Sequence, residues 1–135
     1  MIEEPLGVFT DPSTEALLLK GAEEFNAGKF FECHETLEEA WRACRGPGRD
    51  FLQGLIQVSV GFYHLRNGNF VGGKSQLEKG LQKIERYDDS YAGMVCGELK
   101  NIVKSWLEKV RSGDMLQDGL PELPKFRFAG AKGVA

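Results

Sequence analysis

Several features that define other protein classes are missing from this chain of 135 residues. No apolar run reaches the roughly 18 residues that a membrane-spanning helix needs, so we expect no membrane contact. Residues 1–5, Met-Ile-Glu-Glu-Pro, lack the basic and apolar regions of a secretory signal peptide. The three cysteines have no zinc-like spacing and their number is odd, which argues against a disulfide framework. These absences together predict a cytoplasmic protein.

Basic character is scarce as well. The 17 Lys and Arg residues are outnumbered by 20 Asp and Glu residues, which gives a net charge of −3. The basic residues are scattered along the chain, and nucleic-acid binding normally requires a basic patch. We therefore expect no nucleic-acid partner. A composition of 41% hydrophobic and 27% charged residues is that of an ordinary globular domain.

What the sequence does contain is helical periodicity. Asp11 followed by Pro12 predicts a helix start. The predicted helices cover about residues 12–27, 30–44, 49–66, 70–87 and 91–110. The third is apolar around most of its circumference and should lie at the centre of a bundle. From residue 113 the pattern fades, so we predict a helical domain over 1–112 and an irregular tail over 113–135, which Phe126 and Phe128 would attach to the body.

A weak internal repeat of forty residues relates the first two pairs of helices. Residues 25–30 align with residues 65–70, and each copy reads as helix, Gly-X-Phe turn and helix. The predicted fold is all-α, a compact five-helix bundle or array of two helical hairpins plus a covering C-terminal helix. Gly54 and Gly61 lie on one line of the third helix, where glycine is unfavourable. Another helix or a ligand should therefore approach the backbone there.

His34 and Glu38 lie one helical turn apart at the edge of the apolar side of the second predicted helix. A buried imidazole and a buried carboxylate need partners, so they form either a structural pair or part of a site. The third helix has one polar stripe, which carries Gln53, Gln57 and His64. Helices joined by a short loop pack antiparallel, and this pairing predicts that the stripe meets the His34 and Glu38 edge.

The resulting candidate ligand-binding residues form a polar seam between the second and third helices: His34, Glu38, Trp41, Gln53, Gln57 and His64. Gaps between helices are common sites for small ligands. The same seam also fits a structural network that fixes the register of the helices and needs no ligand. His34, Glu38 and His64 are suitable metal ligands, but the paired Glu-X-X-His motifs of di-iron bundles are missing. No metal or other cofactor is predicted.

Three motifs in these helices resemble those of a known family. Residues 31–41 read Phe-Glu-Cys-His-Glu-Thr-Leu-Glu-Glu-Ala-Trp, residues 51–57 read Phe-Leu-Gln-Gly-Leu-Ile-Gln, and His64 is followed by Gly68-Asn69-Phe70. Their combination, over about residues 15–87, resembles the DUF309 family, a domain of unknown function. The resemblance implies a small all-α protein and no established activity.

Two classes of function stay open on the sequence alone. We prefer a non-catalytic binding or scaffold domain. The alternative is a small-molecule or metal-dependent enzyme that uses His34, Glu38 and His64. No catalytic residue is assigned, because no nucleophile accompanies the histidines. Trp106 and the tail over 120–126 would suit a homodimer or an unidentified protein partner, and they would equally serve to cover the central helix.

Overall fold

The computed structural model describes residues 9–113 and 120–129. Its elements are α1 (Pro12–Asn26), α2 (Phe30–Ala43), α3 (Arg49–Arg66), α4 (Phe70–Ile84), the short 3-10 helix η1 (Tyr91–Gly93) and α5 (Cys96–Ser112). The described part of the chain contains no sheet, and its one isolated bridge joins Met94 to Phe128. The predicted all-α fold is confirmed.

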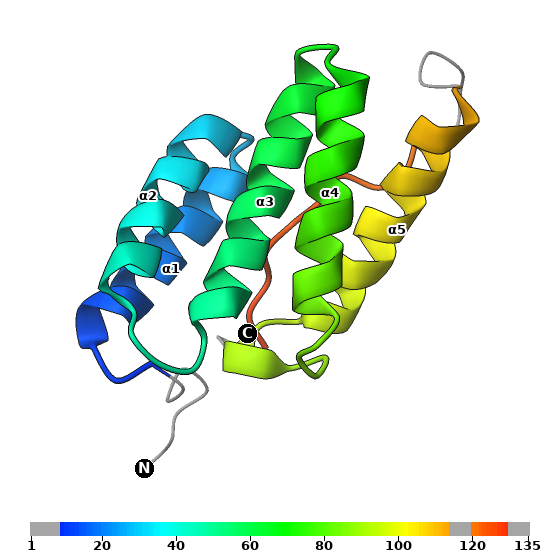
Figure 1. Cartoon of the computed structure of the whole chain (residues 1–135). Coiled ribbons are helices and arrows are strands. Elements are labelled where there is room, and N and C mark those ends of the chain that lie inside the picture. Colours follow the sequence, from blue (N-terminus) through cyan, green and yellow to red (C-terminus); the bar gives the residue numbers. More distant parts are fainter. Residues whose placement is uncertain (1–8, 114–119, 130–135) are drawn as a thin grey trace.

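The helices run alternately up and down, side by side (Figure 1). The α1–α2 hairpin forms one edge, the α3–α4 hairpin lies in the middle, and α5 forms the other edge. α3 is central, as predicted, and its buried residues occupy most of its circumference: Phe51, Leu52, Gly54, Leu55, Ile56, Val58, Ser59, Gly61, Phe62 and Leu65. Within 9–113 and 120–129, no helix combines the length and hydropathy needed to cross a bilayer.

The two hairpins repeat one another in structure as well as in sequence. Their turns contain Gly28 at φ 80° and Gly68 at φ 81°, both in the left-handed region that favours glycine. A Cβ atom on Gly21 would lie 2.7 Å from Leu37 Cδ2. Forty positions later, a Cβ atom on Gly61 would lie 2.7 Å from Leu77 Cδ2. In each hairpin, therefore, the two helices pack against each other through the same glycine–leucine contact.

The glycine line of α3 faces α4. A Cβ atom on Gly54 would lie 2.9 Å from Ile84 Cγ2, and one on Gly80 would lie 2.8 Å from the carbonyl oxygen of Gly54. Since these contacts are between the helices themselves, a helix and not a ligand approaches the backbone of α3 there.

Two predicted helix boundaries are wrong. α4 ends at Ile84 instead of about residue 87, and α5 begins at Cys96 instead of residue 91. Ala92 at φ 56° and Gly93 at φ 75° interrupt the segment between them. Left-handed residues cannot continue a right-handed helix. The backbone oxygen of Asp89 then accepts the N–H of Cys96 at 2.8 Å, which caps the new helix.

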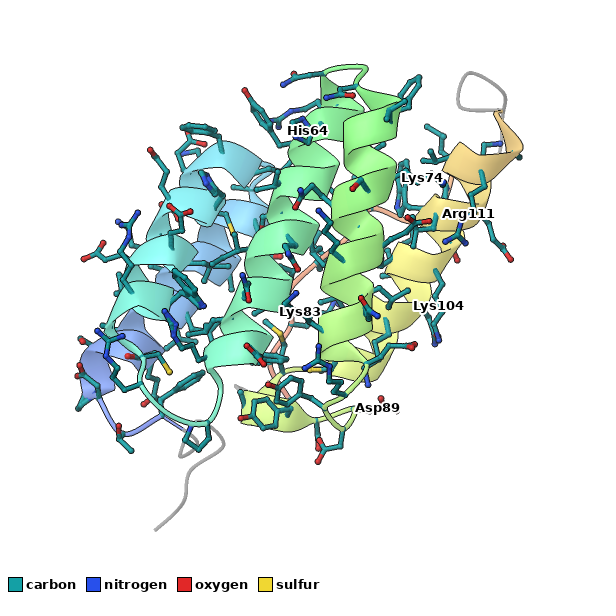
Figure 2. The ribbon with its side chains drawn as sticks, viewed as in Figure 1. His64, Lys74, Lys83, Asp89, Lys104 and Arg111 are labelled. Carbon is teal, nitrogen blue, oxygen red and sulfur yellow. The ribbon has the colours of Figure 1, made fainter. Side chains whose placement is uncertain are left out.

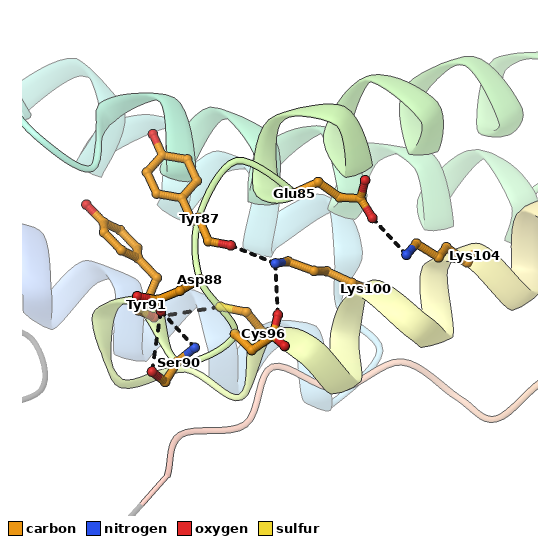
Figure 3. Close-up of polar contacts among 9 residues, drawn as sticks. Glu85, Tyr87, Asp88, Ser90, Tyr91, Cys96, Lys100 and Lys104 are labelled. Atoms are coloured by element: carbon orange, nitrogen blue, oxygen red, sulfur yellow. Dashed lines mark hydrogen bonds and ion pairs between the residues drawn. The ribbon is translucent and has the colours of Figure 1, made fainter.

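Lys100 attaches this connection to α5 (Figure 3). Its Nζ donates to the backbone oxygen of Tyr87 at 2.6 Å and to Asp89 Oδ1 at 3.0 Å. The Lys100 side chain is only 11% exposed, although it is charged. Its hydrogen bonds therefore compensate for its burial.

The segment over residues 120–129, called the strap below, is extended and lies across the body (Figure 1). Phe126 is buried and stacks on Phe25, with ring centroids 3.7 Å apart and an interplanar angle of 6°. Phe126 thus attaches the tail as expected. Trp106 of α5 is also buried and lies edge-on to Phe62 of the central helix α3. The remainder of the predicted tail, 114–119 and 130–135, lies outside the described residues.

Candidate functional site

His34 and Glu38 lie on α2 at the margin of its buried face, not within it. Their side chains are 23% and 38% exposed, and His34 Nε2 is 3.7 Å from Glu38 Oε2. The expectation that both are buried is therefore wrong. Leu37 packs against Gly21 of α1 and Cys33 contacts Ser59 of α3, so the neighbouring line of α2 occupies the interior.

The predicted polar network across α2 and α3 does not form. Glu38 Oε1 accepts from Arg42 Nη2 at 3.2 Å, and Arg49 lies 3.8 Å above the ring of Trp41. Among the described residues, no hydrogen bond joins Gln53 or Gln57 to the α2 candidates.

The position of Gln57 on α3 explains why it does not reach α2. Gln57 lies about 60° around α3 from Gly54, at 100° per residue. Gly54 faces α4, so Gln57 lies on the side of α3 nearer to α4, whereas His64, nearer the end of α3, is the stripe residue that meets α2. Gln57 Oε1 is buried and has no hydrogen-bond partner among the described residues.

His34 and His64, the two histidines of the chain, do come together in one crevice between α2 and α3. The crevice has a volume of about 190 Å³ and is lined by Phe30, Phe31, His34, Val60, Tyr63 and His64. Its position is marked by His64, at the upper end of α3 in Figure 2. Five of its six lining side chains are aromatic rings.

Phe31 connects the two walls of the crevice. Its ring centroid lies 5.3 Å from that of His34 and 5.5 Å from that of Tyr63. Tyr63 in turn lies 5.9 Å from His64. Phe31 stays 46% exposed despite these contacts, so an apolar surface faces solvent at the crevice.

Sequence reasoning missed the apolar lining, namely Phe30, Phe31, Val60 and Tyr63. A signal for it existed, because residues 30, 31 and 34 and residues 60, 63 and 64 are spaced as neighbours on one face of a helix.

The hydrogen bonds of the two histidines differ in direction. His34 Nδ1 lies 3.2 Å from the backbone oxygen of Phe31, which can only accept, so Nδ1 is the donor. His64 Nδ1 lies 3.4 Å from Asn69 Nδ2, which can only donate. The amide orientation of Asn69 is fixed because its Oδ1 caps α4 by accepting the N–H of Gly72 at 2.9 Å. His64 therefore accepts at Nδ1 and, when neutral, carries its proton on Nε2.

Metal and thiol chemistry find no support at this crevice. Across residues 9–113 and 120–129, no group of three or more His, Cys, Asp or Glu side chains could hold a metal ion. Cys33 lies in the core with its Sγ 3.2 Å from Ser59 Oγ, and burial raises the pKa of its thiol to about 12. A thiol with so high a pKa is a poor nucleophile. The geometry is that of a small, mostly apolar crevice.

Comparison with known proteins shows that the crevice lies in the part of the chain that matches a described family. Residues 18–75 match the family described as "Domain of unknown function (DUF309)", and all six lining residues fall in that range. An uncharacterised protein of Aquifex aeolicus (strain VF5) is 30% identical over 100 residues, which cover 73% of this chain and 29% of that protein. The uncharacterised protein YpuF of Bacillus subtilis (strain 168) is 30% identical over 93 residues, which cover 66% of this chain and 53% of that protein. The chain thus spans about half or less of the length of these relatives.

Proposed function

We propose that this chain, which belongs to the DUF309 family through residues 18–75, is a non-catalytic binding domain whose ligand site is the crevice between α2 and α3. The observation that carries the proposal is the meeting of both histidines with three further aromatic rings in one partly open cavity. A ring such as Phe31 that is 46% exposed beside a cavity marks a surface suited to an apolar group.

The volume of the crevice limits what enters it. At about 190 Å³ it is smaller than the roughly 300 Å³ at which pockets for drug-sized ligands begin. A single ring or branched aliphatic group fills such a space. Anchoring of one apolar group in a small pocket is the usual centre of a protein interface, and a protein partner is therefore part of the proposal.

A cytoplasmic location is also part of the proposal. All three cysteines are buried free thiols. Cysteines persist in this form in reducing compartments, whereas exported proteins of this size commonly pair them.

Titration of the protein with toluene, followed by ¹H–¹⁵N correlation NMR, tests the site. We expect saturable shifts centred on Phe31, Val60 and Tyr63. Val60→Phe places a ring in the crevice and should abolish these shifts.

Leu123→Phe is the matched control, because Leu123 is 69% exposed and does not line the crevice. It should bind toluene as the wild type does. Shifts that fail to saturate, or that persist unchanged in Val60→Phe, would contradict the proposal.

A further inference from the structure

We propose that the group taken by the crevice is an apolar side chain accompanied by its own backbone amide, as in a hydrophobic residue of a peptide. This inference rests on the proposed function and specifies its ligand. It follows from the opposite hydrogen-bonding character of the two crevice walls, each of which carries one of the histidines.

The α3 wall of the crevice presents a hydrogen-bond donor. Asn69 Nδ2 donates to His64 Nδ1, because Asn69 Oδ1 is already engaged by the N–H of Gly72. The neutral imidazole then has its N–H at Nε2, the ring nitrogen that no described residue engages. A ligand beside His64 is therefore offered a donor and gains from carrying an acceptor.

The α2 wall of the crevice presents a hydrogen-bond acceptor. His34 Nδ1 uses its N–H on the backbone oxygen of Phe31, which leaves the lone pair of Nε2 when the ring is neutral. Glu38 Oε2 lies 3.7 Å from this nitrogen, and Arg42 holds the other carboxylate oxygen at 3.2 Å. A ligand beside this wall gains from carrying a donor.

A peptide group supplies both requirements, since it carries one N–H donor and one C=O acceptor. A bare hydrocarbon satisfies neither wall. A ligand with a carboxylate as its only polar group offers no donor to the α2 wall, and it is repelled by the charge of Glu38, whose Oε2 lies 3.7 Å from His34 Nε2. The volume of about 190 Å³ holds one side chain, so the rest of a peptide would continue outside the crevice.

The same end of the bundle offers an apolar surface for that continuation. α2 and α4 both begin there, next to the two Gly-X-Phe turns (Figure 1). Phe70 is 37% exposed and Val71 is 85% exposed at the start of α4. Phe70 and Val71 offer contacts to the neighbouring residues of a peptide chain, and a free amino acid has no such residues. Their exposure therefore favours a peptide as the ligand.

Four probes separate these ligand types in the same NMR titration: toluene, 3-phenylpropionate, free phenylalanine and N-acetylphenylalaninamide. We expect N-acetylphenylalaninamide to bind about tenfold more tightly than toluene, which corresponds to one or two hydrogen bonds. 3-Phenylpropionate should bind no better than toluene. Free phenylalanine should bind more weakly than its capped form.

Two substitutions of His64 isolate the donor. His64→Gln keeps an N–H at the position of Nε2 but gives up the contact with Asn69, whereas His64→Asn keeps an acceptor for Asn69 and removes the donor at the crevice. His64→Gln should retain the preference for N-acetylphenylalaninamide over toluene, and His64→Asn should lose it. Toluene makes no hydrogen bond to His64, so the affinity of each variant for toluene is the reference against which its preference is measured.

The outcomes distinguish the two proposals. Equal affinity of the wild type for toluene and N-acetylphenylalaninamide would overturn the amide inference while leaving the binding crevice in place. Tighter binding of free phenylalanine than of the capped form would overturn the peptide assignment. Absence of saturable binding by all four probes would overturn both the inference and the proposed function.

Discussion

The side-chain amide of Asn26 forms two hydrogen bonds with the backbone of Phe126, 100 residues further along the chain. Asn26 Nδ2 donates to the Phe126 carbonyl oxygen at 3.0 Å, and Asn26 Oδ1 accepts the Phe126 N–H at 2.8 Å. This arrangement reproduces, with a side chain, the double exchange between opposite residues of antiparallel strands. Lys125 Nζ adds a bond to the backbone oxygen of Asn26 at 3.0 Å. The strap is therefore fastened at the end of α1.

Asn26→Ala should lower the free energy of unfolding by about 2 kcal/mol, because it leaves a partly buried N–H and C=O of Phe126 without partners. Chemical denaturation followed by circular dichroism measures this change. Asn101→Ala is the control, since Asn101 is exposed on α5, and it should change stability by less than about 0.5 kcal/mol. Equal effects of the two substitutions would show that the amide pairing contributes nothing.

Phe126→Ala should be more damaging, at about 3–4 kcal/mol, because it removes a buried ring that stacks on Phe25 and leaves a cavity. Leu123 belongs to the same strap and is 69% exposed. Leu123→Ala should therefore stay within about 0.5 kcal/mol of the wild type in the same denaturation experiment. A small loss for Phe126→Ala would mean that the strap does not complete the core.

Sequence reasoning succeeded where a helix boundary has a local cause. Asp11 accepts the N–H of Ser13 at 3.0 Å, and Gly28 and Gly68 take the left-handed conformation that ends α1 and α3. It failed at Ala92, because alanine is the best helix former and nothing local predicts a φ of 56° there. Distant contacts surround that turn: the N–H of Val95 donates to the backbone oxygen of Arg127.

The sequence predicted only part of the crevice, because the rest also depends on contacts between distant segments. Helical phase and a short loop predicted that His34 and His64 would face a common space between two helices, and both line the crevice. The same reasoning misplaced Gln57, because phase gives the direction of a stripe on its own helix but not which neighbour covers it. Gly54 and Gly80 determine that α4 lies on that side, and their contact joins two helices that sequence periodicity treats separately.

Gly80→Ala should destabilise the protein by about 1–3 kcal/mol, because its Cβ would lie 2.8 Å from the Gly54 carbonyl oxygen and 3.0 Å from the Val58 backbone nitrogen. Backbone atoms cannot yield as a flexible side chain does, so α3 and α4 would have to separate. Gly46→Ala, whose Cβ meets nothing within 4 Å, should be nearly neutral. Thermal unfolding of the two variants compares these sites directly.

The buried thiols should make stability fall at alkaline pH. Burial raises the pKa of Cys33 from its ordinary value of 9.0 to about 12, and that of Cys96 to about 11. Above pH 9 the thiols of the unfolded chain lose their protons while those of the folded chain keep them. Their stabilisation is thus complete below pH 9 and is lost as pH rises toward the folded pKa values, by at most about 1.4 kcal/mol per pH unit for each thiol.

Denaturation curves at intervals between pH 8 and pH 11 measure this slope. Cys33→Ala should reduce it, while Tyr87 and Tyr91, whose pKa values burial also raises, contribute equally in both proteins. An identical slope in Cys33→Ala and the wild type would contradict the assignment to this thiol. At pH 8, Cys33 and Cys96 should react with a thiol reagent only after denaturation.

Lys100→Met should lower the free energy of unfolding by about 2 kcal/mol, since it removes two charge-assisted hydrogen bonds and leaves the Tyr87 carbonyl oxygen unpaired (Figure 3). Lys104→Met is a close control on the same helix. Lys104 Nζ lies 2.8 Å from Glu85 Oε2, but its side chain is 52% exposed, so its loss should cost less than about 1 kcal/mol. Added salt should weaken the Lys104 contribution and leave that of the buried Lys100 largely unchanged. If the two variants lose equal stability at both low and high salt, Lys100 is an ordinary surface cation and the connection between α4 and α5 is held by its backbone alone.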